Sequence, residues 1–310
     1  MRGLRFGGKL RVYSFCLLLG GGMSPVVVGQ LTHIKVDHAS VCGSQLDAMR
    51  ETFAAAGLST DYGGPHANAG TQMALLGFDD GSYLELIAPQ KPGMAADSSW
   101  AKMITGDAGP CAWAIPSADL RAEIARLKSK GVEAEEPRPG KRTRPDGKVI
   151  QWETARIGPD APGAVLPFMI EDQTPRQFRA WPSASVQGSP LTGIAVVVIG
   201  VKDLEAASAL FRRTYGWSPP AIEQHGEFGA KLAYFPGSPV MLATPLDQKS
   251  WLAEQLQTFG EHPVAYLLGT HTLEGASSRF GLWPRSKWFA RNLAWFDVKK
   301  LRGLRLGVVE

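Results

Sequence analysis

The sequence of 310 residues lacks the short motifs that mark several large enzyme classes. It has no glycine-rich nucleotide-binding fingerprint, no nucleophile turn of the Gly-x-Ser-x-Gly type and no closely spaced cysteine pair that would hold zinc. These absences exclude a Rossmann-type nucleotide site, an α/β-hydrolase serine site and a cysteine-bound zinc in their usual forms.

The body of the chain also lacks an excess of charge of either sign. The whole sequence has 33 Lys and Arg against 29 Asp and Glu. Four of the cations, Arg2, Arg5, Lys9 and Arg11, lie within residues 1–29, a segment with no acidic residue. The remainder is therefore neutral, which gives no electrostatic reason to expect nucleic acid as a partner.

The apolar run at residues 12–23 is too short to span a bilayer comfortably. It follows a basic stretch and precedes small residues just before Gln30, a pattern typical of a secretory signal. We therefore predict a periplasmic or secreted protein that begins near Gln30 and has no membrane anchor after cleavage. The alternative is a start codon near Met23 and a cytoplasmic protein.

The sequence does contain one pattern four times: an apolar strand, a short polar corner ending in leucine, an amphipathic helix and a glycine. The four leucines, Leu46, Leu120, Leu204 and Leu273, lie roughly 70 to 85 residues apart, and short strand-like runs follow each helix. A unit of this kind cannot bury its sheet face alone. We therefore expect the units to pair around a pocket.

Three segments between these elements have the composition of loops. Residues 62–71 and the basic stretch 137–147 are rich in Gly and Pro, and residues 175–190 have the composition of a linker. If the predicted signal is removed, two cysteines remain, Cys42 and Cys111, near the first strands of neighbouring repeats. An oxidising compartment would permit a disulfide between them. The alternative, which we prefer from the sequence, is two buried thiols that pack as small apolar groups.

Several short motifs occur in a characteristic order within this frame. They are VDH at residues 36–38, GGPH at 63–66, Gly70-Thr71, YLEL at 83–86, RPDG at 144–147, Trp152 and LPFMIE at 166–171. Together they resemble the glyoxalase-like domain proteins of the vicinal oxygen chelate superfamily, which includes glyoxalase I and the extradiol (dihydroxybiphenyl-type) dioxygenases. The resemblance is best over about residues 31–175 and continues weakly through residues 191–310.

The resemblance implies an α+β fold in which tandem βαβββ modules pair into two barrels. The expected organisation is a signal peptide at residues 1–29, a first glyoxalase-like domain at 30–175, a linker at 176–190 and a degenerate second domain at 191–310. The second domain is expected to lack a metal site, because its aligned strands at residues 191–198 and 240–245 carry no histidine and no carboxylate.

In metal-dependent members the ligands come from the first and last strands of paired repeats. The resemblance assigns this role to His38 and Glu85, with Glu171 as a further ligand from the second repeat and His66 as an auxiliary from the loop. An imidazole with carboxylates suits zinc, iron, manganese or nickel. The alternative is a satisfied histidine near a strand end and an edge carboxylate that faces solvent. No catalytic acid or base can be named from the sequence.

Four further residues are candidates for ligand binding. His66 and Thr71 would donate hydrogen bonds to a ligand that the neighbouring glycines allow to come close, although His66 is equally a plain loop residue. Arg144 could hold a carboxylate or phosphate in a bidentate fork, but we prefer a solvated turn for Arg142 and Arg144. Trp152 is expected in the wall of the barrel.

Two functions follow from this set of residues. The first is a small-molecule lyase, isomerase or dioxygenase that uses a divalent metal in the first barrel. The alternative is a protein of the same fold that sequesters a small ligand without turnover, because a fold does not fix the chemistry.

Overall fold

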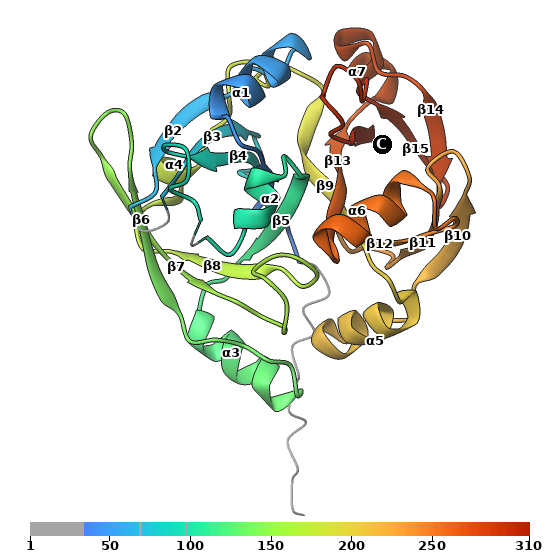
Figure 1. The fold of residues 1–310 in the computed structure, drawn as a ribbon, viewed down its shortest axis with the longest axis horizontal. Helices are drawn as coiled ribbons and strands as arrows, with labels where there is room; N and C mark the ends of the chain where they lie inside the picture. Colours follow the sequence, from blue (N-terminus) through green and yellow to red (C-terminus); the bar gives the residue numbers. More distant parts are fainter. Residues whose placement is uncertain (1–33, 68–69, 97) are drawn as a thin grey trace, which may run out of the picture. The chain divides into compact units, whose positions relative to one another are not determined.

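The computed structural model describes residues 34–67, 70–96 and 98–310. The segment predicted to be a signal peptide, residues 1–29, lies outside the described residues. In the described part of the chain, the strands form two eight-stranded sheets (Figure 1). The fold class predicted from the sequence is confirmed: each sheet is a nearly closed barrel made of two βαβββ modules.

The first sheet contains two units with the same order of elements. The first unit comprises β1 (His38–Cys42), α1 (Leu46–Ala55), β2 (Asp61–Pro65), β3 (Thr71–Gly77) and β4 (Tyr83–Pro89). The second comprises β5 (Gly109–Pro116), α3 (Leu120–Ser129), β6 (Arg138–Thr143), β7 (Val149–Ala155) and β8 (Phe168–Asp172). The strand order is β2-β3-β4-β1-β5-β8-β7-β6, so the units meet at the antiparallel pair β1 and β5.

The second sheet repeats this topology. Its units are β9 (Leu191–Gly200), α5 (Leu204–Tyr215), β10 (Ala221–His225), β11 (Ala230–Tyr234) and β12 (Val240–Pro245), then β13 (His262–Thr270), α7 (Leu273–Phe280), β14 (Arg285–Trp288), β15 (Arg291–Trp295) and β16 (Leu306–Val309). The order is β10-β11-β12-β9-β13-β16-β15-β14. Short connecting helices complete the fold: α2 (Ala101–Thr105), α4 (Arg176–Arg179) and α6 (Trp251–Phe259).

In three of the four repeats, the polar corner before the leucine is the N-terminal cap of the helix. Asp119, Asp203 and Thr272 each accept a hydrogen bond from a backbone N–H in the first turn of α3, α5 and α7. Gly216 and Gly281 end α5 and α7 in the left-handed conformation that glycine adopts without strain. None of the described helices is long and apolar enough to cross a membrane.

Residues 138–143 of the basic segment that the sequence predicted to be a loop form strand β6 instead, and residues 62–65 of the other predicted loop belong to β2. Strand β6 pairs antiparallel with β7, and its glycine, Gly140, lies opposite Trp152. A Cβ at Gly140 would lie 2.3 Å from the indole Nε1 of Trp152, so the glycine makes room for this ring. Pro139 is tolerated because β6 is the last strand of the sheet, where a missing N–H breaks no ladder.

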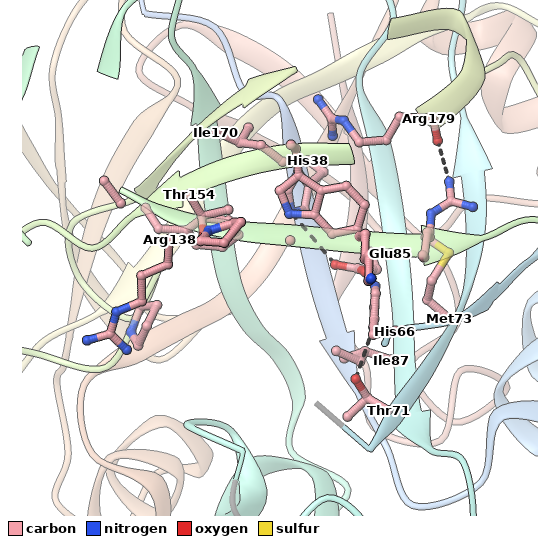
Figure 2. A pocket seen from close by; sticks show the side chains of 18 of the residues that line it. His38, His66, Thr71, Met73, Glu85, Ile87, Arg138, Thr154, Ile170 and Arg179 are labelled. Carbon is pink, nitrogen blue, oxygen red and sulfur yellow. Dashed lines mark hydrogen bonds and ion pairs between the residues drawn. The ribbon is translucent and has the colours of Figure 1, made fainter. Parts of the chain in front are cut away.

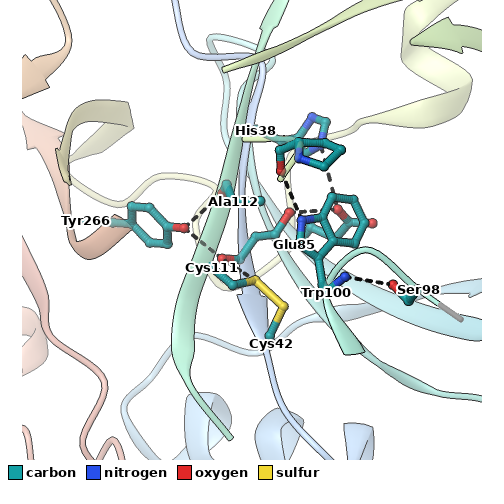
Figure 3. Close-up of a disulfide and its surroundings, with 10 residues drawn as sticks. His38, Cys42, Glu85, Ser98, Trp100, Cys111, Ala112 and Tyr266 are labelled. Carbon is teal, nitrogen blue, oxygen red and sulfur yellow. Dashed lines mark hydrogen bonds and ion pairs between the residues drawn. A yellow bond between two sulfur atoms is a disulfide. The ribbon is translucent and has the colours of Figure 1, made fainter. Parts of the chain in front are cut away.

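Cys42 and Cys111 form a disulfide, against the preference for two buried thiols (Figure 3). Their Cα atoms are 5.8 Å apart, within the range that a disulfide spans. The pairing is possible because β1 and β5 are antiparallel neighbours, so the end of one lies beside the start of the other.

Tyr266 links the second sheet to the first. This tyrosine of β13 is fully buried, and its hydroxyl lies 2.7 Å from the carbonyl oxygen of Ser40 and 2.9 Å from that of Ala112 (Figure 3). Those carbonyls belong to β1 and β5, the two central strands of the first sheet. One phenol therefore contacts the seam between both units of the first barrel.

Replacing Tyr266 with Phe should lower the free energy of unfolding by about 1 to 2 kcal/mol, because buried carbonyls lose their hydrogen-bond partner. Tyr215→Phe is the matched control: its hydroxyl is buried and has no partner among the described residues. Removing that group should leave stability unchanged or raise it. Chemical denaturation of both variants measures this, and equal effects would contradict the role of Tyr266.

Candidate functional site

A cavity of about 270 Å³ lies inside the first barrel. Its volume is just below the usual range for small-ligand sites. Most of its wall is aromatic or apolar, formed by Met73, Tyr83, Ile87, Trp100, Trp152, Phe168 and Ile170. Within this wall the polar side chains of His38, His66 and Glu85 lie close together (Figure 2).

The register of β1 and β4 brings His38 and Glu85 to the same side of the sheet. The strands are parallel, with His38 opposite Tyr83 and Ser40 opposite Glu85. Alternation along β1 turns Ala39 toward the large apolar core, so His38 and Ser40 face the cavity side. The His38 ring stacks on Tyr83 with 4.8 Å between ring centroids.

Glu85 is 7% exposed and stands between three polar groups. Ser40 Oγ donates a hydrogen bond to Oε2 at 3.1 Å. His38 Nε2 is 3.7 Å from Oε2, and His66 Nε2 is 3.4 Å from Oε1. Both imidazoles thus direct the same ring nitrogen toward one carboxylate.

The second imidazole is positioned by the end of β2. His66 Nδ1 and Thr71 Oγ1 share a hydrogen bond of 3.0 Å, and the backbone of His66 bridges to Arg142 of β6. A Cβ at Gly64 would lie 2.1 Å from the carbonyl oxygen of Thr143. The glycine therefore lets β6 approach β2 and close the barrel, whereas the sequence suggested that it admits a ligand.

A buried ion pair contacts His38 at the ring nitrogen that points away from Glu85. Asp37 Oδ1 lies 2.6 Å from His38 Nδ1, and the Arg179 guanidinium binds both Asp37 oxygens at 2.8 and 2.9 Å. Burial raises the pKa of Asp37, but Arg179 and His38 outweigh it and hold that pKa well below its usual range. Asp37 is therefore ionised and fixes the His38 ring with Nε2 toward the cavity.

Sequence reasoning missed both members of this ion pair. Arg179 belongs to α4, inside the segment that was expected to be a linker, and Asp172 at the end of β8 binds it as well. A signal for Asp37 was present, because it places a charge between Val36 and His38 at the start of a buried strand. Arg179 carried no comparable signal.

The structure brings some of the predicted site residues together and separates others. His38, Glu85, His66, Thr71 and Trp152 all line the cavity. Glu171 and Arg144, predicted as a metal ligand and a ligand-binding residue, do not line it.

Glu171 is turned away by the alternation of side chains along β8. Phe168, which is paired with Ala114 of β5, and Ile170 both line the cavity. Because side chains alternate along a strand, Glu171 faces the other side. Its carboxylate accepts a hydrogen bond of 2.8 Å from the backbone N–H of Leu120, at the start of α3. This contact satisfies a free helix N–H.

The sequence favoured a solvated turn for both arginines before the β6–β7 turn, but their side chains differ in burial and contacts. The Arg144 guanidinium lies over the ring of Trp181, 4.4 Å from its centroid, and pairs with Asp146 at 3.2 Å. Arg142, two residues earlier and within β6, is 2% exposed and lines the cavity.

Glu85 and the two histidines beside it provide donor atoms of the types that bind divalent metals. Two imidazole nitrogens and a carboxylate suit iron, manganese, nickel or zinc, and each imidazole has its other nitrogen already engaged. No group of three or more His, Cys, Asp or Glu within the described residues is close enough to form a complete metal site. Ligand atoms that share a cation lie roughly 3 to 3.5 Å apart, so these side chains would draw together slightly on binding.

The interior of the second barrel is filled by apolar side chains. The cluster includes Val196, Val198, Leu232, Met241 and Leu267, closed by the aromatic rings of Phe228, Trp288 and Trp295. The same topology therefore encloses buried polar groups in the first sheet and an apolar core in the second.

The family follows from the sequence and the fold together. A family model described as a glyoxalase-like domain matches residues 36–215, more than half of the chain. The chain belongs to the glyoxalase-like domain family. No curated protein shows significant sequence similarity to it.

A solved structure shares the fold of this glyoxalase-like protein. A hypothetical protein from Staphylococcus aureus is 15% identical, with a TM-score of 0.56, over 89% of this chain and 98% of its own. A methylmalonyl-CoA epimerase from Mycobacterium tuberculosis is 21% identical, with a TM-score of 0.34, over 39% of this chain and 89% of its own.

The buried imidazole of His66 should make stability depend on pH. Burial lowers its pKa below the ordinary value near 6.5, while the Glu85 carboxylate opposes the shift. The unfolded chain then binds the proton more readily, so the free energy of unfolding falls as the pH drops below about 6.5. Denaturation between about pH 5 and pH 8 should show this slope, and His66→Gln should reduce it.

His262 provides the internal comparison for this measurement. Burial lowers its pKa too, so His262→Gln should remove a separate part of the slope. An unchanged slope in the His66 variant would contradict the assignment of a buried neutral imidazole.

Proposed function

We propose that the first barrel is a small-molecule enzyme of the lyase, isomerase or dioxygenase type that works with a divalent metal. The observation that carries the proposal is the approach of His38 Nε2 and His66 Nε2 to the two oxygens of Glu85 inside an aromatic cavity. Members of the vicinal oxygen chelate superfamily commonly use divalent metals. In this proposal His38, Glu85 and His66 hold the cation, and His66 takes the place that the sequence assigned to Glu171.

When bound, the metal would act as a Lewis acid that polarises an oxygen of the substrate. The protein's own contribution is orientation. Asp37 holds Nδ1 of His38, Thr71 holds Nδ1 of His66, and Ser40 holds one oxygen of Glu85. These contacts fix which atom of each side chain faces the cavity, so little reorganisation is needed when a substrate arrives.

The rings around the cavity serve the substrate itself. Trp100 is fixed by a hydrogen bond of 3.0 Å from its indole N–H to the carbonyl of Pro162, and Phe168 packs beside it. Trp152 meets His66 edge to face, with 6.2 Å between ring centroids. A planar or apolar body held between such rings would be shielded from water next to the polar cluster.

The second candidate is a protein that binds a small ligand without turnover. The apolar and aromatic wall favours it, because such a wall recognises an organic ligand whether or not chemistry follows. The two candidates differ in one measurable property, which is the requirement for a metal.

The purified protein should bind one divalent cation per chain when it is titrated with Fe²⁺, Mn²⁺, Ni²⁺ or Zn²⁺. The variants His38→Ala, His66→Ala and Glu85→Ala should each lose that binding, because each removes a donor atom. Isothermal titration calorimetry and elemental analysis after dialysis measure it. A thermal melt of each variant should show a folded protein, because polar cavity side chains contribute little core packing.

Two controls make this titration specific. Glu171→Gln should bind the metal as the unsubstituted protein does, because Glu171 faces away from the cavity. His225→Gln should also retain binding, and it tests the group in the second barrel in which His225 lies beside Glu223 and Glu227. Absence of tight binding by the unsubstituted protein would favour the non-catalytic candidate.

We also propose that the chain is exported and that residues 1–29 are removed. The disulfide between Cys42 and Cys111 supports this, because stable disulfides are rare in reducing compartments. The mature protein from native cells should begin near Gln30, as measured by intact mass. A polypeptide that retains Met1, or one that starts near Met23 in the cytosol, would contradict export.

A further inference from the structure

Arg142 is a buried cation without a carboxylate in contact. Its guanidinium binds two backbone carbonyl oxygens, that of Gly63 and, at 2.7 Å, that of Arg179. No Asp or Glu of the described residues forms an ion pair with it. Of its five N–H donors, the described residues therefore account for two.

The neighbouring Arg179 is also buried in this barrel, but its charge is neutralised by carboxylates. It is buried to the same degree, but Asp37 and Asp172 both bind it through charge-assisted hydrogen bonds. Carbonyl oxygens supply partial charge only, so they leave the charge of Arg142 uncompensated. A buried charge without a charged partner destabilises the folded state unless a group of opposite charge binds it.

The cavity is where that partner can come from. Arg142 lines it together with His66 and Glu85. Glu85 acts on Arg142 from a distance, but its oxygens face Ser40 and the two imidazoles. Burial lowers the pKa of Arg142, against the attraction of Tyr83 and Glu85, yet an arginine stays charged in proteins.

The cations at the rim of the cavity either form an ion pair or are exposed to solvent. Arg138 and Arg156 both pair with Glu135, at 3.0 and 2.8 Å. Lys141 is exposed to solvent. Among the described cations that line the cavity, Arg142 is therefore the one that is shielded from water and has no carboxylate in contact.

We propose that Arg142 binds the carboxylate of the ligand, so that the substrate is a small organic acid with a planar or apolar body. One uncompensated guanidinium matches a single negative charge, and its planar fork matches the geometry of a carboxylate. The aromatic wall formed by Trp100, Trp152 and Phe168 accommodates the remainder of the molecule. The proposal deepens the proposed function by naming the ligand class of the same cavity.

Benzoate and its neutral amide, benzamide, form a matched pair of probes that differ in charge at one position. Titrations monitored by calorimetry and by tryptophan fluorescence are made in EDTA, so that no metal contributes. Benzoate should bind about tenfold or more tighter than benzamide, because charge-assisted hydrogen bonds are the stronger kind. Equal binding of the two probes, or no binding of benzoate at millimolar concentration, would overturn the proposal.

Three variants locate the charge. Arg142→Met should reduce benzoate binding to the level of benzamide, whereas Arg144→Met, two residues along and stacked on Trp181, should bind benzoate as before. Lys141→Met should also keep the preference. A preference that survives Arg142→Met, or that disappears with Lys141→Met, would place the anion elsewhere and overturn the assignment.

Arg142 also joins β6 to β2 and α4, so the methionine variant can lose stability. Arg142→Lys keeps the charge but loses the fork, and it should bind benzoate with intermediate affinity. The comparison of benzoate with benzamide on the unsubstituted protein needs no variant. Because every titration is free of metal, a failure of metal binding and a failure of anion binding are separate results.

Discussion

Asp37 and Arg179 form a bidentate ion pair in the interior of the first barrel, and the arrangement of the cavity depends on this contact. The two residues are 142 positions apart in the chain. A carboxylate buried this deeply would be unfavourable alone, and the fork of Arg179 satisfies both of its oxygens. The same contact fixes α4 against β1 and leaves Asp37 ionised next to His38.

Two consequences follow for the polar groups of the cavity. The ionised Asp37 holds one nitrogen of His38, which directs the other toward Glu85. The position of α4 also brings the carbonyl oxygen of Arg179 to Arg142, which donates a hydrogen bond to it. This contact holds the charged guanidinium of Arg142 in the wall of the cavity. The helix α4, which lies in the segment predicted to be a linker, is thus part of the site.

The two barrels share one topology and differ in what fills it. In the first, polar side chains on β1, β4 and the end of β2 stand around a cavity. In the second, the interior is an apolar cluster closed by Trp288 and Trp295. Tyr266 connects them at the central strands of the first sheet. The topology therefore does not decide the chemistry, which depends on the side chains at a few inward positions.

The sequence by itself determined the repeats, and its resemblance to the vicinal oxygen chelate superfamily predicted the fold class and the candidate pair His38 and Glu85. Strand and helix periodicity are local properties, and the motifs on β1 and β4 lie in strands whose alternation can be read directly. The basic segment 137–147 was misread for the same local reason, because its glycine and prolines resemble a loop until Trp152 and the sheet edge are known.

Only the tertiary structure decided the rest of the site. A shift of one residue in strand register reverses every side chain, and this is why Ile170 lines the cavity and Glu171 caps a helix. The docking of α4 buries Arg142, whose guanidinium binds the carbonyl of Arg179, whereas Arg144, beyond the end of β6, lies over the ring of Trp181. Pairing between segments far apart in the chain sets these directions, and no local pattern contains that information.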